Sequence, residues 1–168
     1  SIEMGHPQQV ALDRLAADAV VFDDATSTAS QTVPSVLSVW TGRYPTHHGN
    51  RYFPETASFR VAREQVWPRV PEDVPLLQEI LAANGYATGA VVTNPWLKRR
   101  YGFDRGFDVY RILLQPGAVT RGSHVNDVVA SLLPGVRERP LFLYVHYMDA
   151  HPPFDPAPRF RERYVAGL

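Results

Sequence analysis

The sequence predicts an α/β fold, a three-layer sandwich in which a mainly parallel sheet lies between two layers of helices. Segments with apolar residues at helical spacing alternate along the chain with short, continuously apolar segments that are typical of strands. Such alternation favours parallel strands joined by right-handed crossover connections. The last of these strands, at residues 141–147, is apolar at nearly every position, which suits a central strand covered on both faces.

The first elements in chain order are a helix and a strand. Residues 9–17 can place their apolar side chains on one side of a helix, and residues 19–22 are predicted to be extended. Because the chain starts at Ser1 with neither a Met nor a basic and apolar leader, we expect it to be a fragment or a processed product.

A second helix is predicted at residues 34–41. Thr32 can cap it, and Pro34 suits its first turn because the missing N–H would have no intrahelical partner there. Gly42 can take the left-handed conformation that ends a helix. The sequence therefore predicts a short helix with Thr32 at its start.

The remaining elements follow in regular alternation. Residues 42–71 are polar and carry prolines, so we expect a long surface excursion beside the site. Residues 76–83 predict an amphipathic helix, and residues 87–93 predict a buried strand. Residues 123–133 predict another helix before the strand at 141–147.

Composition agrees with a globular protein, and the sequence shows no strong internal domain boundary. The chain is 45% hydrophobic and 20% charged, and its 17 basic and 17 acidic side chains balance, which gives no electrostatic reason to expect nucleic acid. No apolar run approaches the roughly 18 residues of a membrane span. The chain has no cysteine and therefore no disulfide, so its compartment, cytoplasmic or periplasmic and extracellular, stays open.

Thr32 is the candidate nucleophile. Its hydroxyl precedes a short helix whose unpaired N–H groups would face an anion held there. The alternative is that Thr32 only caps the helix, because Thr followed by Pro is a common helix start.

Further sequence blocks surround this segment and continue to the end of the chain. They comprise residues 12–16, 20–25, 32–35, 41–45, 48–49, 85–88, 94–97, 102–108 and 142–154. In this order they resemble the sulfatase family within the alkaline phosphatase superfamily. The resemblance implies an incomplete alkaline phosphatase-like sandwich, with residues 1–168 as a single partial catalytic domain that lacks its first strand and its C-terminal half.

The resemblance implies a metal-dependent hydrolase or transferase of phosphate or sulfate esters that acts through Thr32. In the sulfatase signature the leading residue is Cys or Ser, which is oxidised to formylglycine, and an arginine follows where this chain has Val36. Thr32 cannot give that aldehyde because its side-chain carbon carries a methyl group. Like the superfamily's phosphodiesterases and phosphate transferases, the chain would instead attack with the hydroxyl itself and form a covalent Thr32 ester.

Three other residues are predicted to serve the site. His151 resembles the family histidine that contacts the ester oxygens, so we expect it to bind the anion or donate a proton. Asn94 could donate to an ester oxygen, although an Asn-Pro pair is also a common turn. Asp149 could face the same side as His151 and contact substrate, or it could serve as a cap or turn former.

The resemblance also implies a divalent metal, either zinc, manganese or calcium. Thr32 would be one ligand, and the main ligands are expected outside this fragment, which alone should be inactive. The expected partner is a small-molecule phosphate or sulfate ester, and the oligomeric state stays open. Two other classes also stay open: a catalytically inactive binding module with the sulfatase fold, and an unrelated α/β binding domain in which Thr32 caps a helix.

Overall fold

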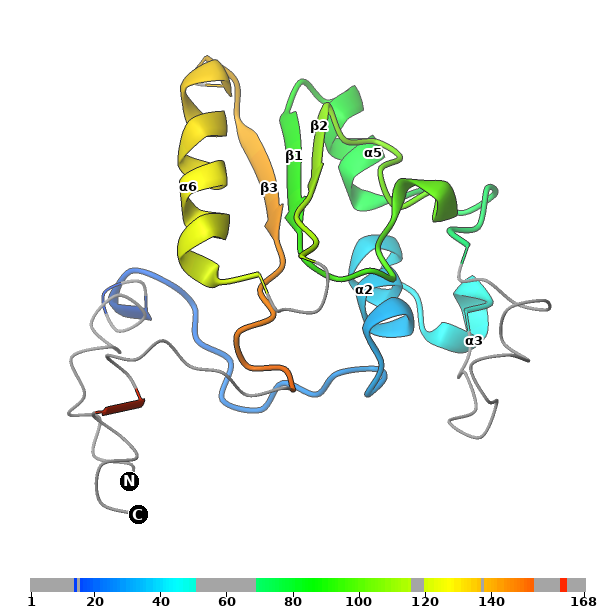
Figure 1. The fold of residues 1–168 in the computed structure, drawn as a ribbon. Coiled ribbons are helices and arrows are strands. Elements are labelled where there is room, and N and C mark those ends of the chain that lie inside the picture. Colours follow the sequence, from blue (N-terminus) through cyan, green and yellow to red (C-terminus); the bar gives the residue numbers. More distant parts are fainter. Residues whose placement is uncertain are drawn as a thin grey trace.

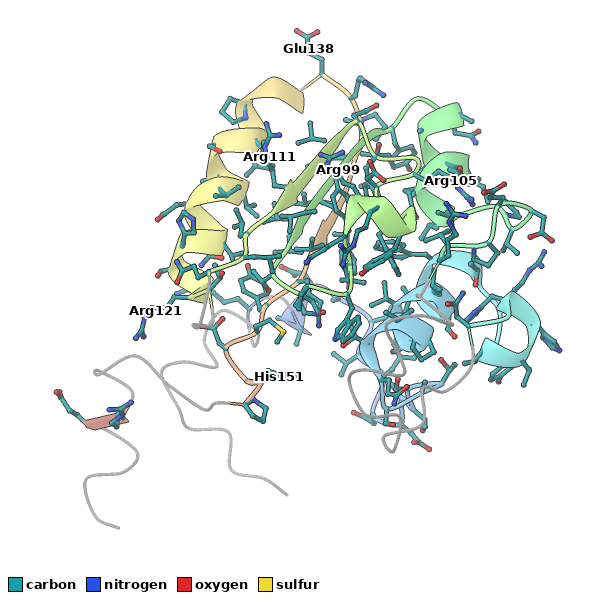
Figure 2. All side chains as sticks on the ribbon, turned by 45° about the vertical axis from the view of Figure 1, so that its right-hand side comes forward. Arg99, Arg105, Arg111, Arg121, Glu138 and His151 are labelled. Atoms are coloured by element: carbon teal, nitrogen blue, oxygen red, sulfur yellow. The ribbon has the colours of Figure 1, made fainter. Side chains whose placement is uncertain are left out.

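The computed structural model describes residues 14, 16–50, 69–115, 120–136, 138–152 and 161–162. Its centre is a three-stranded sheet in the order β2-β1-β3, formed by β1 (Ala87–Val92), β2 (Val109–Ile112) and β3 (Leu141–Val145) (Figure 1). Both neighbours run parallel to β1. Helix α5 (Leu77–Ala83) lies on one side of the sheet and α6 (Gly122–Leu132) on the other (Figures 1 and 2). The predicted layered α/β fold with a parallel sheet is confirmed.

Burial follows the position of each strand in the sheet. Every residue of β1 is buried, because β1 has a strand on each side and helices over both faces. The residues of β3 are only half-buried, and no described strand pairs with its outer edge. Among the described residues β1 is the central strand and β3 lies at the edge, so the predicted central position of residues 141–147 is not observed there. An apolar run reports side chains suited to burial, and it does not report how many neighbouring strands the segment has.

Helix α2 (Thr32–Thr41) packs against the sheet through its apolar side. Leu37 is fully buried and Trp40 is 1% exposed, whereas Val39 points outward. The Trp40 ring lies edge-on to the Tyr144 ring of β3, with their centroids 5.0 Å apart. This packing ties α2 to the sheet and thereby fixes the position of Thr32 at the start of the helix.

The two ends of α2 differ in how well they follow the prediction. Gly42 adopts φ 64° and its N–H bonds to the Ser38 carbonyl, so the predicted left-handed C-terminus is confirmed. The predicted Thr32 cap was wrong, because Gln31 occupies the N-cap position and Thr32 is the first helical residue. Gln31 makes no side-chain capping bond, and the Thr32 hydroxyl accepts a hydrogen bond from Asn94.

The predicted strand at residues 19–22 was also wrong. Val20 and Phe22 are 80% and 77% exposed, and this segment belongs to no sheet. A strand needs a neighbour for its backbone bonds, and none of the described residues provides one here. Of the predicted helix at 9–17, Arg14, Ala16 and Ala17 are helical, and the remainder lies outside the described residues.

The predicted helices at residues 76–83 and 123–133 and the predicted strand at residues 87–93 are confirmed to within a few residues, whereas β2 was not predicted. The predicted excursion opens with a short helix, α3 (Pro45–His48), and residues 51–68 within it lie outside the described part of the chain. A 3₁₀ turn, η1 (Arg99–Tyr101), precedes β2, and another, η2 (Leu133–Val136), continues α6. Among the described helices, none combines the length and apolar character needed to cross a bilayer.

Candidate active site

Thr32 and Asn94 meet although 62 positions separate them in the sequence. Thr32 begins α2, and Asn94 lies just beyond the carboxyl end of β1. The Asn94 amide Nδ2 donates to the Thr32 hydroxyl oxygen at 3.2 Å. The carboxyl ends of parallel strands are where open α/β sheets bind ligands, so the contact lies at the expected edge of the fold.

A second hydrogen bond fixes the orientation of the Asn94 amide. The backbone N–H of Trp96 donates to Asn94 Oδ1 at 2.9 Å, which directs the NH₂ group toward Thr32. Asn94 is 3% exposed, whereas Thr32 is only half-buried. The Thr32 oxygen therefore accepts a bond from Asn94, keeps its own hydrogen for donation, and stays within reach of a ligand.

The first turn of α2 adds backbone donors beside Thr32. The first intrahelical bond runs from the Ser35 N–H to the Gln31 carbonyl at 3.2 Å. The N–H groups of Thr32 and Val33 precede that bond, so the helix supplies them with no acceptor. Together with the helix dipole they favour an anion at this end.

His151 lies on the turn that follows β3 and is exposed (Figure 2). Its N–H donates to the Met148 carbonyl at 2.9 Å, and the Met148 sulfur lies 3.8 Å from Asn94 Nδ2. Met148 therefore links the turn of His151 to the pair formed by Thr32 and Asn94. Among the described hydrogen bonds none joins His151 to Thr32 directly, and the imidazole Nδ1 contacts the Pro152 carbonyl at 2.7 Å.

Asp149 contacts the start of α6. Its Oδ1 accepts from the Gly122 N–H at 3.0 Å. A Cβ on Gly122 would lie 3.0 Å from Asp149 Oδ2, so the carboxylate fits closely because residue 122 has no side chain. Of the two sequence interpretations, the contact with a helix N-terminus is observed, and substrate binding by Asp149 stays a prediction.

Sequence reasoning missed His146 and its partner Thr93. The Thr93 hydroxyl donates to the His146 carbonyl at 2.9 Å and contacts the imidazole Nδ1 at 3.3 Å. Burial lowers the pKa of His146 below 6.5; a backbone hydrogen bond opposes this change, and the interaction with His151 adds to it. The available signal was a histidine and a threonine at the carboxyl ends of two strands that the sequence already predicted.

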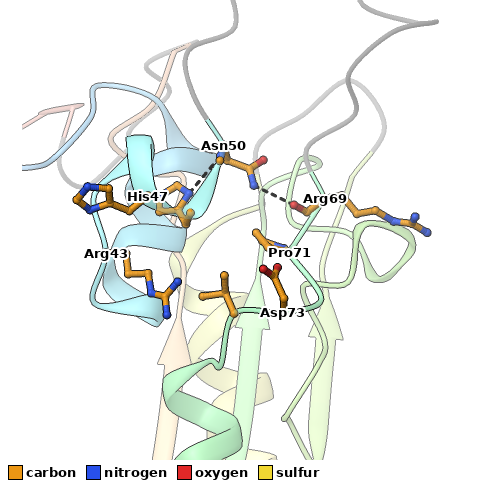
Figure 3. Close-up of a pocket in the computed structure, with 9 residues that line it drawn as sticks. Arg43, His47, Asn50, Arg69, Pro71 and Asp73 are labelled. Carbon is orange, nitrogen blue, oxygen red and sulfur yellow. Dashed lines mark hydrogen bonds between the residues drawn. The ribbon is translucent and has the colours of Figure 1, made fainter.

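A cavity of about 440 Å³ lies beside α3 and away from Thr32 (Figure 3). Its described lining includes Arg43, Asn50, Arg69 and Asp73, and none of the predicted site residues. His48, at its wall, is 2% exposed, accepts a bond from the Asn50 N–H at Nδ1, and contacts the Ser38 hydroxyl through Nε2 at 3.2 Å. His48 thus ties α3 to α2.

The described residues around Thr32 do not by themselves form a divalent metal site. Thr32 offers one oxygen, but Asn94 points an N–H at it and Met148 offers a thioether, which suits neither calcium nor manganese. In the described part of the chain no three side chains of His, Asp or Glu gather closely enough to hold an ion. The zinc, manganese or calcium implied by the resemblance stays a prediction.

This combination of a parallel α/β sheet and polar groups at its carboxyl edge defines a layered α/β protein with a candidate site at that edge. The model of the Sulfatase family matches residues 3–167, so the chain belongs to the sulfatase family. No curated protein is similar enough in sequence to count as a match.

A solved structure supports the fold. The chain is similar to BT4656, which was solved in complex with its substrate D-glucosamine-2-N,6-O-disulfate, with a TM-score of 0.71 and 18% sequence identity. The match covers 94% of this chain and 33% of BT4656, so the chain spans about a third of that protein's length.

Proposed function

We propose that the protein hydrolyses a sulfate or phosphate ester, or transfers its sulfuryl or phosphoryl group, through Thr32. The observation that carries this proposal is the 3.2 Å bond between Asn94 Nδ2 and the Thr32 oxygen. It joins two residues predicted separately for the site and holds the hydroxyl at the start of α2. Membership of the sulfatase family supports the substrate class.

The proposed reaction has two halves. In the first, the Thr32 oxygen bonds to sulfur or phosphorus as its hydroxyl proton passes to solvent, and the bond from that atom to the leaving alcohol oxygen breaks. In the second, water or another alcohol attacks the Thr32 ester and restores the hydroxyl. The N–H groups at the start of α2 and the Asn94 amide can stabilise negative charge on the nonbridging oxygens. His151, exposed on the adjacent turn, donates a proton to the leaving alcohol.

A sulfate ester is the first substrate to test. The fold neighbour BT4656 carries a sulfated glucosamine as its substrate, and this supports a sulfated sugar as one starting compound. The hydroxyl nucleophile, by contrast, is shared with phosphate-transferring members of the superfamily. We further propose that residues 1–168 form part of a larger catalytic domain, so assays should use the protein at its full natural length.

The test compares Thr32→Val with Thr32→Ser on matched aryl sulfate and aryl phosphate esters, with zinc, manganese or calcium added in turn. Valine keeps the shape of threonine and removes the hydroxyl, and serine keeps the hydroxyl. We expect Thr32→Val to lose on the order of a thousandfold or more in kcat, the scale of removing a covalent nucleophile. Thr32→Ser should retain activity. Equal rates for Thr32→Val and the natural protein would remove Thr32 from the mechanism.

A further inference from the structure

His146 is a titratable group at the carboxyl edge of the sheet that the reaction described above does not use. It follows β3 directly, and its N–H continues the strand pairing by donating to the Val91 carbonyl at 2.9 Å. Because strand side chains alternate, His146 lies on the same face as Tyr144, which packs against Trp40 of α2. His146 therefore faces the layer that carries Thr32.

The hydrogen bonds of Thr93 determine the tautomer of His146. The Thr93 hydroxyl has one hydrogen, and it is donated to the His146 carbonyl at 2.9 Å. At the 3.3 Å contact with Nδ1, the Thr93 oxygen can therefore only accept, so Nδ1 must carry the ring hydrogen. In the neutral ring this leaves Nε2 with an unshared electron pair, which is the form that accepts a proton.

Two residues that are adjacent in the chain, Thr93 and Asn94, connect His146 to the candidate site. Thr93 fixes the ring, and the next residue, Asn94, donates to the Thr32 oxygen. Further along the β3 turn, Met148 contacts the same Asn94 amide. Residues 93 and 94, which are adjacent in the chain, thus contact His146 and Thr32 respectively.

We propose that His146 Nε2 accepts the proton of the water that hydrolyses the Thr32 ester, which deepens the proposed function and rests on it. The water oxygen bonds to sulfur or phosphorus as one of its O–H bonds breaks, and that proton moves to Nε2. The bond from sulfur or phosphorus to the Thr32 oxygen breaks, and this oxygen takes the proton back from the imidazolium. The products are the Thr32 hydroxyl and sulfate or phosphate, with His146 neutral again.

The surroundings of His146 favour its neutral form near pH 7. Burial is the largest cause and lowers the pKa of His146, a backbone hydrogen bond raises it, and the neighbouring His151 lowers it. β1 contributes the uncharged Thr93 and Asn94, and α2 contains no titratable residue. On α6, His124 and Asp127 are exposed. A neutral, buried imidazole suits a proton acceptor better than it suits an anion-binding cation.

The test compares His146→Asn with the natural full-length protein on an aryl ester. Asparagine can keep an N–H directed at Thr93, but it has no basic nitrogen in place of Nε2. We expect the first-turnover burst of aryl alcohol to remain, while steady-state turnover falls by about 10²–10⁴-fold. The natural protein should lose its hydrolysis rate as pH falls through the lowered pKa of His146, and this acidic limb should vanish in His146→Asn.

Each outcome separates this inference from the proposed function. If His146 were needed only for the structure, His146→Asn would lose the burst together with turnover. That result, or unchanged turnover, would overturn the proposed role of His146 and leave the proposed function untouched. A natural protein without ester hydrolysis would overturn the proposed function and this step with it. Nitrogen NMR of the His146 imidazole gives a second measurement. In the natural protein we expect the neutral ring to carry its hydrogen on Nδ1, and in Thr93→Val we expect a mixture of the two tautomers. A ring protonated at Nε2 in the natural protein would contradict the assignment.

Discussion

The bond between Asn94 and Thr32 predicts an energetic coupling between two residues that are distant in sequence. Asn94→Ala removes the donor to Thr32 and leaves the Trp96 N–H without its acceptor. At about 1 kcal/mol for each net hydrogen bond, we expect a loss of about 2 kcal/mol in the free energy of unfolding. Thr32→Val removes only the first bond and should cost about 1 kcal/mol. The double variant should lose about 2 kcal/mol, which is less than the sum of the single losses by a coupling of about 1 kcal/mol.

Urea unfolding of the full-length protein, followed by tryptophan fluorescence, measures this cycle. A control cycle pairs Thr32→Val with Ser131→Ala, because the exposed Ser131 hydroxyl on α6 bonds only locally to the Val128 carbonyl. That control should show additive losses. If the Thr32 and Asn94 cycle is equally additive, the hydrogen bond does not contribute to the folded state, and the reasoning that places Thr32 in the site fails.

Three further predictions concern the scaffold that holds the site. Gly106→Ala should lower the free energy of unfolding by several kcal/mol, because φ is 80° and a Cβ would lie 2.6 Å from Glu79 Cγ. Gly85→Ala should lower it by only about 1–2 kcal/mol, because φ is 85° but the space around the added Cβ is open. Thermal unfolding measures both losses. Trp40→Ala should cost about 3–5 kcal/mol in urea unfolding, because the ring is 1% exposed in the core, and Trp40→Phe should cost clearly less. Burial lowers the pKa of His48 below its ordinary 6.5, so the unfolded state binds a proton more readily than the folded state. The free energy of unfolding should therefore fall as pH drops below 6.5 toward the pKa of the folded state. His48→Gln should make the melting temperature depend less on pH in this range. Equal costs for the two alanines, a negligible loss in Trp40→Ala, or an unchanged pH slope in His48→Gln would each contradict the corresponding packing argument.

The regular elements of the fold could be predicted because local patterns specify them. The α2 segment shows this well: apolar spacing gives the helix, and Gly42 gives its left-handed end at φ 64°. Residues 19–22 show the limit, because β-forming side chains favour a strand only where another strand can pair with them. The same limit explains β3, whose apolar run could not reveal that its outer edge is unpaired among the described residues.

The candidate site could be predicted residue by residue, but its geometry could not. Thr32 and Asn94 were selected separately from the resemblance and from their places at element ends. Their contact depends on how α2 packs against β1 and β3. His146 was missed because its chemical state depends on Thr93, a hydroxyl on a different strand, and such a pairing has no local sequence pattern.

The central claim is that Thr32 becomes covalently modified during turnover. The most direct measurement is rapid-quench mass spectrometry of the full-length protein mixed with an aryl sulfate or aryl phosphate. We predict one sulfuryl or phosphoryl group on the peptide that contains Thr32, appearing with the first turnover and absent in Thr32→Val. Turnover with no modification of Thr32, or with the group on another residue, would contradict the account.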